Sequence, residues 1–207
     1  LDLFGLPPTR DMEGQALTRT VRSDAPVREA GLFGMFGSHV SVTDGRYVYM
    51  RASATPENRP LSEHTLMPTH MRARFSPEEL ADAELIPPEF SFTKGAPLLK
   101  MPAWAMGSPW NYGTLLFDLE TDPEQETPLD DPPLELRMIG LLVDLMRRNE
   151  APAEQFERLG LPASGAPDET HLQVRAQWDQ AKAGRRRALR ESDFPKGARV
   201  ATMTIGD

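Results

Sequence analysis

The strongest structural signal in this sequence is an amphipathic helix at residues 132–148. Asp131 can act as its N-cap, and Pro132 suits the first helical position. The apolar side chains recur at helical spacing and form one stripe, which comprises Leu134, Met138, Leu141, Leu142 and Leu145. Because such a stripe needs a covering surface, we expect the helix to pack on one face of a sheet.

Two runs of β-forming residues, 39–43 and 46–51, flank the dipeptide Asp44-Gly45. This arrangement predicts a β-hairpin with a type I′ turn centred on that dipeptide, since such a turn needs positive φ at both central positions. A lone hairpin is marginal in water, and residues 114–119 are a candidate third strand. Together these elements predict an α+β fold, a small antiparallel sheet with a helix packed on one face.

Residues 53–111 carry nine prolines and few periodic patterns, which predicts a long, irregular, loop-rich insertion. Its one regular element is a short helix that begins at Ser76-Pro77-Glu78-Glu79. A serine N-cap, an early proline and acids in the first turn all favour helix initiation. Long loops of this kind are either functional or poorly ordered, and both interpretations stay open at this point.

The chain after residue 150 is expected to divide in two. A short helix around 152–159 is followed by the linker 162–167, which is rich in proline, glycine and serine. We therefore predict a body at 1–165 and a C-terminal tail at 166–207.

The tail is predicted to be mostly helical. A polar helix is expected from Asp168 to about Arg190, with few apolar anchors, and a terminal strand at 199–205. Because this tail has little apolar surface, we expect it to pack on the body or on another subunit, which makes a homo-oligomer through 166–207 possible. The basic run Arg185-Arg-Arg187 with Arg190 is interpreted as a charged helix face or an inter-subunit contact.

Charge and composition exclude several classes of protein. A formal net charge of -8 argues against a general nucleic-acid binder, which needs clustered Lys and Arg. The absence of cysteine excludes disulfides, thiolate zinc sites and a cysteine nucleophile in this chain. No run approaches the roughly 20 apolar residues of a membrane span, and the first residues lack the order of a signal peptide. The cellular compartment stays open.

Three segments follow one another in a distinctive order. They are Leu1-Asp-Leu-Phe-Gly-Leu-Pro7 with Gly14-Gln-Ala-Leu17 behind it, then Val42-Thr-Asp-Gly-Arg-Tyr-Val-Tyr-Met50, and last Leu116-Phe-Asp-Leu-Glu-Thr-Asp-Pro-Glu124. The first is typical of the last turn of an apolar helix, whose beginning we expect upstream of Leu1. In this order, the segments resemble the C-terminal region of sulfatases of the alkaline-phosphatase superfamily.

The resemblance implies a hydrolase of sulfate esters with a calcium site and a formylglycine nucleophile made from Cys/Ser-x-Pro-x-Arg. In that family these motifs lie N-terminal to the segments matched here. The present chain contains neither that motif nor an Asp-His-Gly. We therefore expect calcium and formylglycine in an N-terminal catalytic domain, no cofactor and no catalytic residue in this chain, and no turnover by this chain alone. The chain would be the smaller subdomain that packs on that partner.

The insertion 53–111 is the candidate for a rim of the substrate cleft. An anionic sulfate ester would be attracted by its cations, and histidine can also act as a general acid. The rim candidates are His64, His70, Arg72, Arg74, Lys94 and Lys100. The alternative is that these are ordinary solvated surface cations.

Other polar groups are interpreted more simply. The alternating acids at 118–124 lack the glycine and terminal glutamate of an EF-hand, so we interpret them as a solvated loop. His39 and His171 are interpreted as structural or solvated side chains. Two alternative functions stay open: a phosphonate or phosphodiester hydrolase of the same superfamily, and a non-catalytic interaction module.

Overall fold

The computed structural model describes residues 1–184 except 11, 13, 68 and 106. The basic run at 185–190 and the predicted strand at 199–205 lie outside the described residues. Within the described part, no helix is both long enough and apolar enough to cross a membrane.

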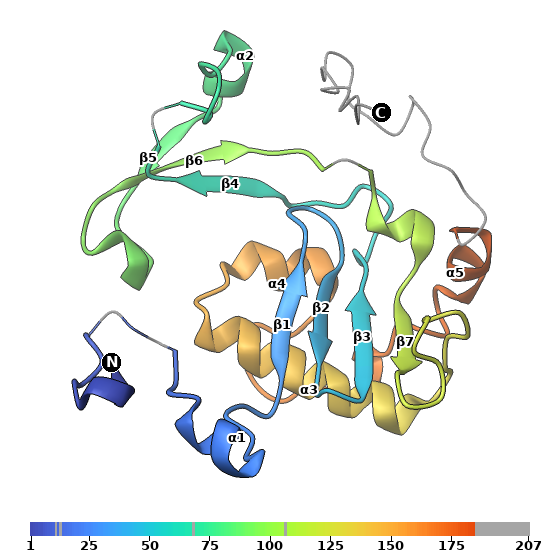
Figure 1. Ribbon diagram of the computed structural model, residues 1–207. Helices are drawn as coiled ribbons and strands as arrows, with labels where there is room; N and C mark the ends of the chain where they lie inside the picture. Colours follow the sequence, from blue (N-terminus) through green and yellow to red (C-terminus); the bar gives the residue numbers. More distant parts are fainter. Residues whose placement is uncertain (11, 13, 68, 106, 185–207) are drawn as a thin grey trace, which may run out of the picture.

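The body is built on a four-stranded antiparallel sheet (Figure 1). Its strands, in spatial order, are β1 (Gly31–Gly34), β2 (Val40–Thr43), β3 (Tyr47–Arg51) and β7 (Leu115–Asp118). Tyr49 pairs with Val42 on one side and Leu116 on the other, and all three are fully buried. The coarse α+β prediction is confirmed, including the hairpin and its third strand.

The hairpin turn lies one residue later than the sequence predicted. Thr43 pairs with Val48, so the central residues are Gly45 and Arg46, and only Gly45 has positive φ, at 97°. This is the pattern of a type II′ turn rather than a type I′ turn. The reason is Asp44, whose carboxylate accepts hydrogen bonds from the backbone N–H groups of Arg46 and Tyr47 at 3.0 and 2.7 Å. Its side chain thereby closes the turn from the preceding position.

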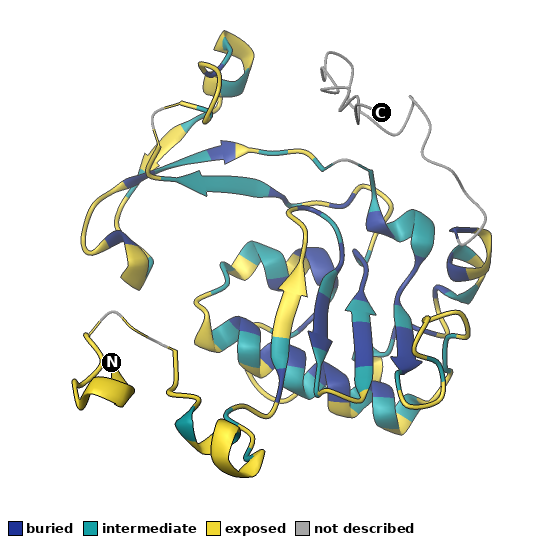
Figure 2. Ribbon diagram, viewed as in Figure 1, coloured by how far each residue is buried: buried dark blue, intermediate teal, exposed yellow. Residues whose placement is uncertain are grey.

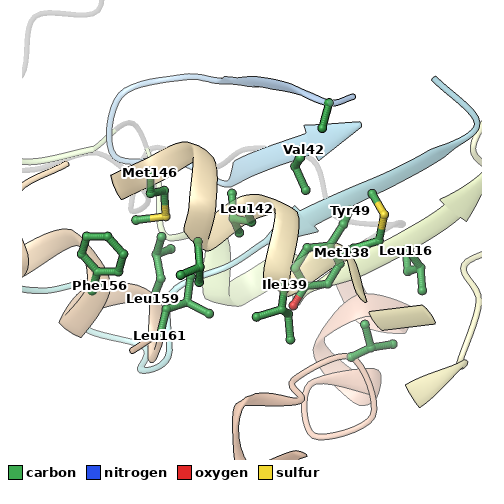
Figure 3. Close-up of a cluster of buried hydrophobic side chains, with 13 residues drawn as sticks. Val42, Tyr49, Leu116, Met138, Ile139, Leu142, Met146, Phe156, Leu159 and Leu161 are labelled. Carbon is green, nitrogen blue, oxygen red and sulfur yellow. The ribbon is translucent and has the colours of Figure 1, made fainter. Parts of the chain in front are cut away.

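Helix α3 (Pro132–Arg148) lies across one face of this sheet, as predicted. The Asp131 carboxylate caps it by accepting the Leu134 N–H at 3.0 Å. Its buried side chains are rotated slightly from the predicted stripe, and they are Glu135, Met138, Ile139, Leu142, Val143 and Met146. Figure 3 shows the apolar side chains of this set, among them Met138, Leu142 and Met146, packed on the sheet and on the next helix, α4 (Ala153–Leu159).

The predicted long helix after Asp168 is wrong. The structure has a single 3-10 turn η4 (Glu169–His171), an extended residue at Leu172, and then a short helix α5 (Trp178–Gly184). The chain leaves helical geometry because the N–H groups of Gln173 and Val174 donate to the buried Glu135 carboxylate at 2.8 and 3.0 Å. The described part of the tail contributes Val174 to the main core. The division near residue 165 stays a prediction.

Residues 53–111 leave the body and return to it as an arm (Figure 1). The arm contains a second antiparallel sheet, of order β4 (Ser62–Thr65), β6 (Leu98–Pro102) and β5 (Glu84–Ile86). It also carries α2 (Pro77–Leu80), η2 (Ser91–Thr93) and η3 (Pro109–Tyr112). The predicted helix at Ser76 is confirmed, with a complete capping box, but the sheet was not predicted.

The first 30 residues are short elements on an exposed segment. They include η1 (Asp2–Phe4), which ends at Gly5 with φ 67°, and α1 (Thr18–Ser23). Figure 2 shows that this segment, β1 and much of the arm are exposed, whereas β2, β3, β7 and the inner face of α3 are buried.

Candidate functional site

The second sheet brings together two of the predicted rim residues. His64 on β4 pairs with Lys100 on β6, which pairs in turn with Glu84 on β5, so the three share one row across the sheet. Residues directly opposite in an antiparallel pair project from the same face. The His64 ring also meets Phe90 edge to face, with ring centroids 5.4 Å apart.

This row is attached to the body through Glu154 of α4. Glu154 Oε2 accepts hydrogen bonds from Lys100 Nζ at 3.0 Å and from Ser62 Oγ at 3.1 Å. Its other oxygen, Oε1, is buried and has no hydrogen-bond partner among the described residues. Burial lowers the pKa of His64, and Lys100 acts in the same direction, whereas Glu154 and Glu89 oppose the shift. Lys100 is thus engaged in a structural ion pair.

His70 belongs to a different cluster. Its Nε2 lies 2.7 Å from Glu79 Oε1, and its ring meets Phe75 at a centroid distance of 4.5 Å. Glu79 Oε2 accepts the Ser76 N–H at 2.6 Å as part of the capping box of α2. That backbone hydrogen bond, followed by the one with His70, lowers the pKa of Glu79. The cluster closes the loop that leads into α2.

The other rim candidates are exposed. Arg72 and Arg74 lie in the loop between β4 and α2, and Lys94 follows η2 with φ 52°. Across the described residues, no hydrogen bond, ion pair or ring contact joins His64 or Lys100 to His70, Arg72 or Arg74. The structure therefore does not gather the six cations into one anion site.

Sequence reasoning missed a buried polar network at the C-terminal end of β3, next to the start of the arm. Arg51 is 2% exposed and donates to the carbonyls of Leu159, Gly160 and His171 and to the Tyr49 hydroxyl. That hydroxyl donates to Glu135 Oε1 at 3.0 Å. Burial is the main cause that raises the pKa of Tyr49. The alternation of Tyr49 and Arg51 on one strand face was the available signal.

A second group of buried, hydrogen-bonded polar side chains links the sheet to the tail and to the arm. The Thr114 hydroxyl and N–H both donate to Gln177 Oε1 at 2.9 Å, and Gln177 Nε2 donates to the Ser53 carbonyl. On the arm side, Arg158 donates to Asn58 Oδ1 at 2.8 Å, and burial lowers the pKa of Arg158 to about 10. Because these groups satisfy one another, we assign them to stability.

The acidic loop is used for local structure. Asp118 accepts two hydrogen bonds from the Arg46 guanidinium at 3.1 and 2.8 Å, which are the leading cause that lowers the pKa of Asp118. The Asp122 carboxylate accepts the N–H groups of Glu126 and Thr127. In the part of the chain that the structure describes, no group of three His, Asp or Glu side chains is arranged to hold a metal ion.

Comparison of the chain with protein-family models, with curated proteins and with solved structures finds no match.

Proposed function

We propose that this chain is the C-terminal part of a sulfatase-like hydrolase and packs on an N-terminal catalytic domain that holds the formylglycine and the calcium. The ordered set of segments at 1–17, 42–50 and 116–124 carries the proposal. The second and third segments lie on the neighbouring strands β3 and β7, where Tyr49 pairs with Leu116. If the segments belong to one subdomain of the same family, they are expected to lie next to each other in the fold, and this adjacency supports the proposal.

The distribution of exposed apolar side chains supports a partner for this chain. All the large hydrophobic side chains that the described residues expose lie in 1–36 and 66–104. Among them are Leu3 at 86%, Phe4 at 79% and Met71 at 88% exposure. The outer elements after residue 105, among them α3 and α5, expose none in the described part (Figure 2). Exposed apolar side chains concentrated in two stretches of the chain are typical of a surface that another domain covers.

Within this proposal the arm is the part of the chain nearest the substrate. Its exposed guanidinium groups, Arg72 and Arg74, are free to approach a sulfate group. Lys100 and His70 already have carboxylate partners, so they would position the arm rather than bind the substrate.

The test has two parts. The purified chain is assayed with an aryl sulfate, with and without calcium, and no turnover above an empty-vector control is expected. The same assay is applied to the complete reading frame that contains this chain, where turnover is expected together with a Cys/Ser-x-Pro-x-Arg motif upstream. Turnover by the chain alone, or a start codon directly upstream of Leu1, would overturn the proposal.

A phosphonate or phosphodiester ester is the alternative within the same proposal, because the C-terminal segments do not discriminate the ester. Parallel assays of the complete protein with an aryl phosphonate and a bis-aryl phosphate decide between them. A rate constant higher for either of these than for the sulfate would assign that ester.

A further inference from the structure

The loop that joins β4 to α2 combines a histidine with two exposed methionines. Met67 lies three positions before His70, and Met71 follows it directly. This loop lies at the end of the arm away from the four-stranded sheet (Figure 1). Met71 is 88% exposed and Met67 is 45% exposed. Methionine is among the residue types that are most often buried, so two exposed thioethers beside one imidazole are unusual.

The His70 ring is held in one orientation by the folded arm. Its Nε2 lies 2.7 Å from Glu79 Oε1, and because an ionised carboxylate only accepts, Nε2 is the nitrogen that carries the proton. In the neutral ring Nδ1 then keeps a lone pair, and none of the described residues forms a hydrogen bond with it. The buried Phe75 ring meets the imidazole edge to face. A carboxylate on one nitrogen and a free lone pair on the other is the arrangement of metal-binding histidines.

The two sulfur atoms can reach the same ion as the His70 ring. At the start of the loop, the Met67 N–H donates to the Thr65 hydroxyl at 2.9 Å. The Cα atoms of Met67 and His70 are at most roughly 11 Å apart, because three positions separate them. The chain also bends at 66, 69 and 71–73, which brings them closer than that limit. A methionine side chain is unbranched and has three rotatable bonds, so it can turn toward an ion beside the ring.

We propose that Met67, His70 and Met71 form a binding site for a monovalent copper ion, Cu⁺. Two thioethers and one imidazole are soft, uncharged donors, a set that suits Cu⁺, whereas Mg²⁺ and Ca²⁺ prefer oxygen ligands. Zinc sites are built from thiolate, imidazole and carboxylate groups rather than thioethers. The neighbouring guanidinium groups of Arg72 and Arg74 repel a divalent ion about twice as strongly as a monovalent one.

The sulfur atoms distinguish this loop from the rest of the exposed apolar surface of the arm. The other large apolar side chains that the described part of the arm exposes carry no metal-binding atom, and they are Leu66, Leu80, Leu85, Phe92 and Trp104. Because the chain has no cysteine, methionine is its only source of soft sulfur ligands. The inference does not depend on the proposed function, since all three ligands belong to this chain.

The test follows the methionine methyl signals of the 207-residue chain by NMR during titration with silver nitrate in a chloride-free buffer. Ag⁺ serves as the probe because it shares the soft-donor preference of Cu⁺ and does not change its oxidation state. The signals of Met67 and Met71 are expected to shift together up to one equivalent, with a dissociation constant of about 10 µM or tighter. Met35 is 67% exposed and provides the internal control, whose signal should not shift.

Variants show whether the ion binds in this loop. Met67→Leu and Met71→Leu keep an apolar side chain but remove the sulfur, and each is expected to weaken Ag⁺ binding about tenfold or more. Met35→Leu is the matched control and should leave the affinity unchanged. His70→Gln should also weaken binding, and thermal unfolding shows whether it is folded. The two leucine variants keep the contacts of His70, so the test does not rest on the histidine variant.

Cu⁺ itself is measured without oxygen, by competition with a coloured chelator, and the variants are expected to follow the same order. Three results would overturn the site: no shift of the Met67 and Met71 signals, an equal shift of Met35, or an affinity that neither leucine variant changes. Equal affinity for Zn²⁺ would overturn the choice of a monovalent ion. None of these results bears on the aryl sulfate assay of the complete reading frame.

Discussion

Lys100 Nζ lies 3.0 Å from Glu154 Oε2, and this ion pair joins β6 of the arm to α4 of the body. The Glu154 side chain is 12% exposed and Lys100 is 36% exposed, so water screens the pair only in part. Glu154 Oε1 has no hydrogen-bond partner in the described part of the chain, so Lys100 and Ser62 are what stabilises the buried carboxylate there.

Replacing Lys100 by methionine is expected to destabilise the chain by about 1–2 kcal/mol, because it leaves a largely buried carboxylate without its cation. Urea unfolding measures the loss, and hydrogen exchange should increase in β4 and β6. The double variant Lys100→Met/Glu154→Met should recover most of the stability. Equal losses in the single and double variants would contradict this assignment.

Glu135 Oε1 accepts three hydrogen bonds, from the Tyr49 hydroxyl and from the N–H groups of Gln173 and Val174. Glu135→Ala should cost about 3 kcal/mol, since it leaves these buried donors unsatisfied. Glu135→Gln keeps an acceptor oxygen and should cost less. Faster amide exchange at Gln173 and Val174 in the alanine variant is the specific readout, and unchanged exchange there would be inconsistent with the structure.

Because His39 is buried, the stability of the folded chain is expected to depend on pH. Burial lowers its pKa from 6.5, and the hydrogen bond with the Gly113 carbonyl only partly opposes that shift. As the pH falls, His39 is therefore protonated at a higher pH in the unfolded chain than in the folded chain. The neutral, buried His39 therefore contributes to the free energy of unfolding above pH 6.5, and this contribution is lost as the pH falls through the pKa of His39 in the folded chain.

The variant His39→Gln keeps a donor for the Gly113 carbonyl but has no ring that binds a proton. It should therefore flatten the fall in stability below pH 6.5. His64, whose pKa is also lowered, contributes with the same sign, and His64→Gln measures its share separately. Urea unfolding between about pH 5 and pH 7.5 provides the comparison. A steeper pH dependence in either variant would contradict the predicted sign.

Gly113 lies where the tail, at Gln177 and Ala181, packs closely against the chain that leads into β7. It has φ 67°, and a Cβ there would lie 2.7 Å from the Gln177 carbonyl oxygen and 2.9 Å from the Ala181 nitrogen. Gly165 has a similar φ of 75° but open space around it. Gly165→Ala should therefore cost about 1 kcal/mol from backbone strain alone, and Gly113→Ala at least about 3 kcal/mol. Thermal unfolding of both measures the difference, and equal costs would show that α5 does not pack as described.

The elements that sequence reasoning predicted correctly are those whose determinants lie within a few residues. The cap of α3 at Asp131 and the cap of α2 at Ser76 each depend on local hydrogen bonds. The type of the hairpin turn was wrong because Asp44 competes for two backbone N–H groups, an effect that the turn dipeptide alone does not reveal.

The second sheet and the candidate site could not be predicted in the same way. The strands β4, β5 and β6 have weak individual patterns, and Lys100 pairs with His64 and Glu84 only after the intervening chain has folded back. The rim prediction selected residues by charge and could not show that Lys100 is paired with Glu154.

The sequence by itself determined the body of this protein: a hairpin, a third strand and an amphipathic helix whose apolar stripe required a sheet. Short-range hydrogen bonds and the periodic placement of apolar residues are sufficient for that much. Only the tertiary structure decided which polar groups are used internally and which face outward. That outcome depends on burial and on partners far along the chain, as Glu135 shows when it holds the tail out of helical geometry.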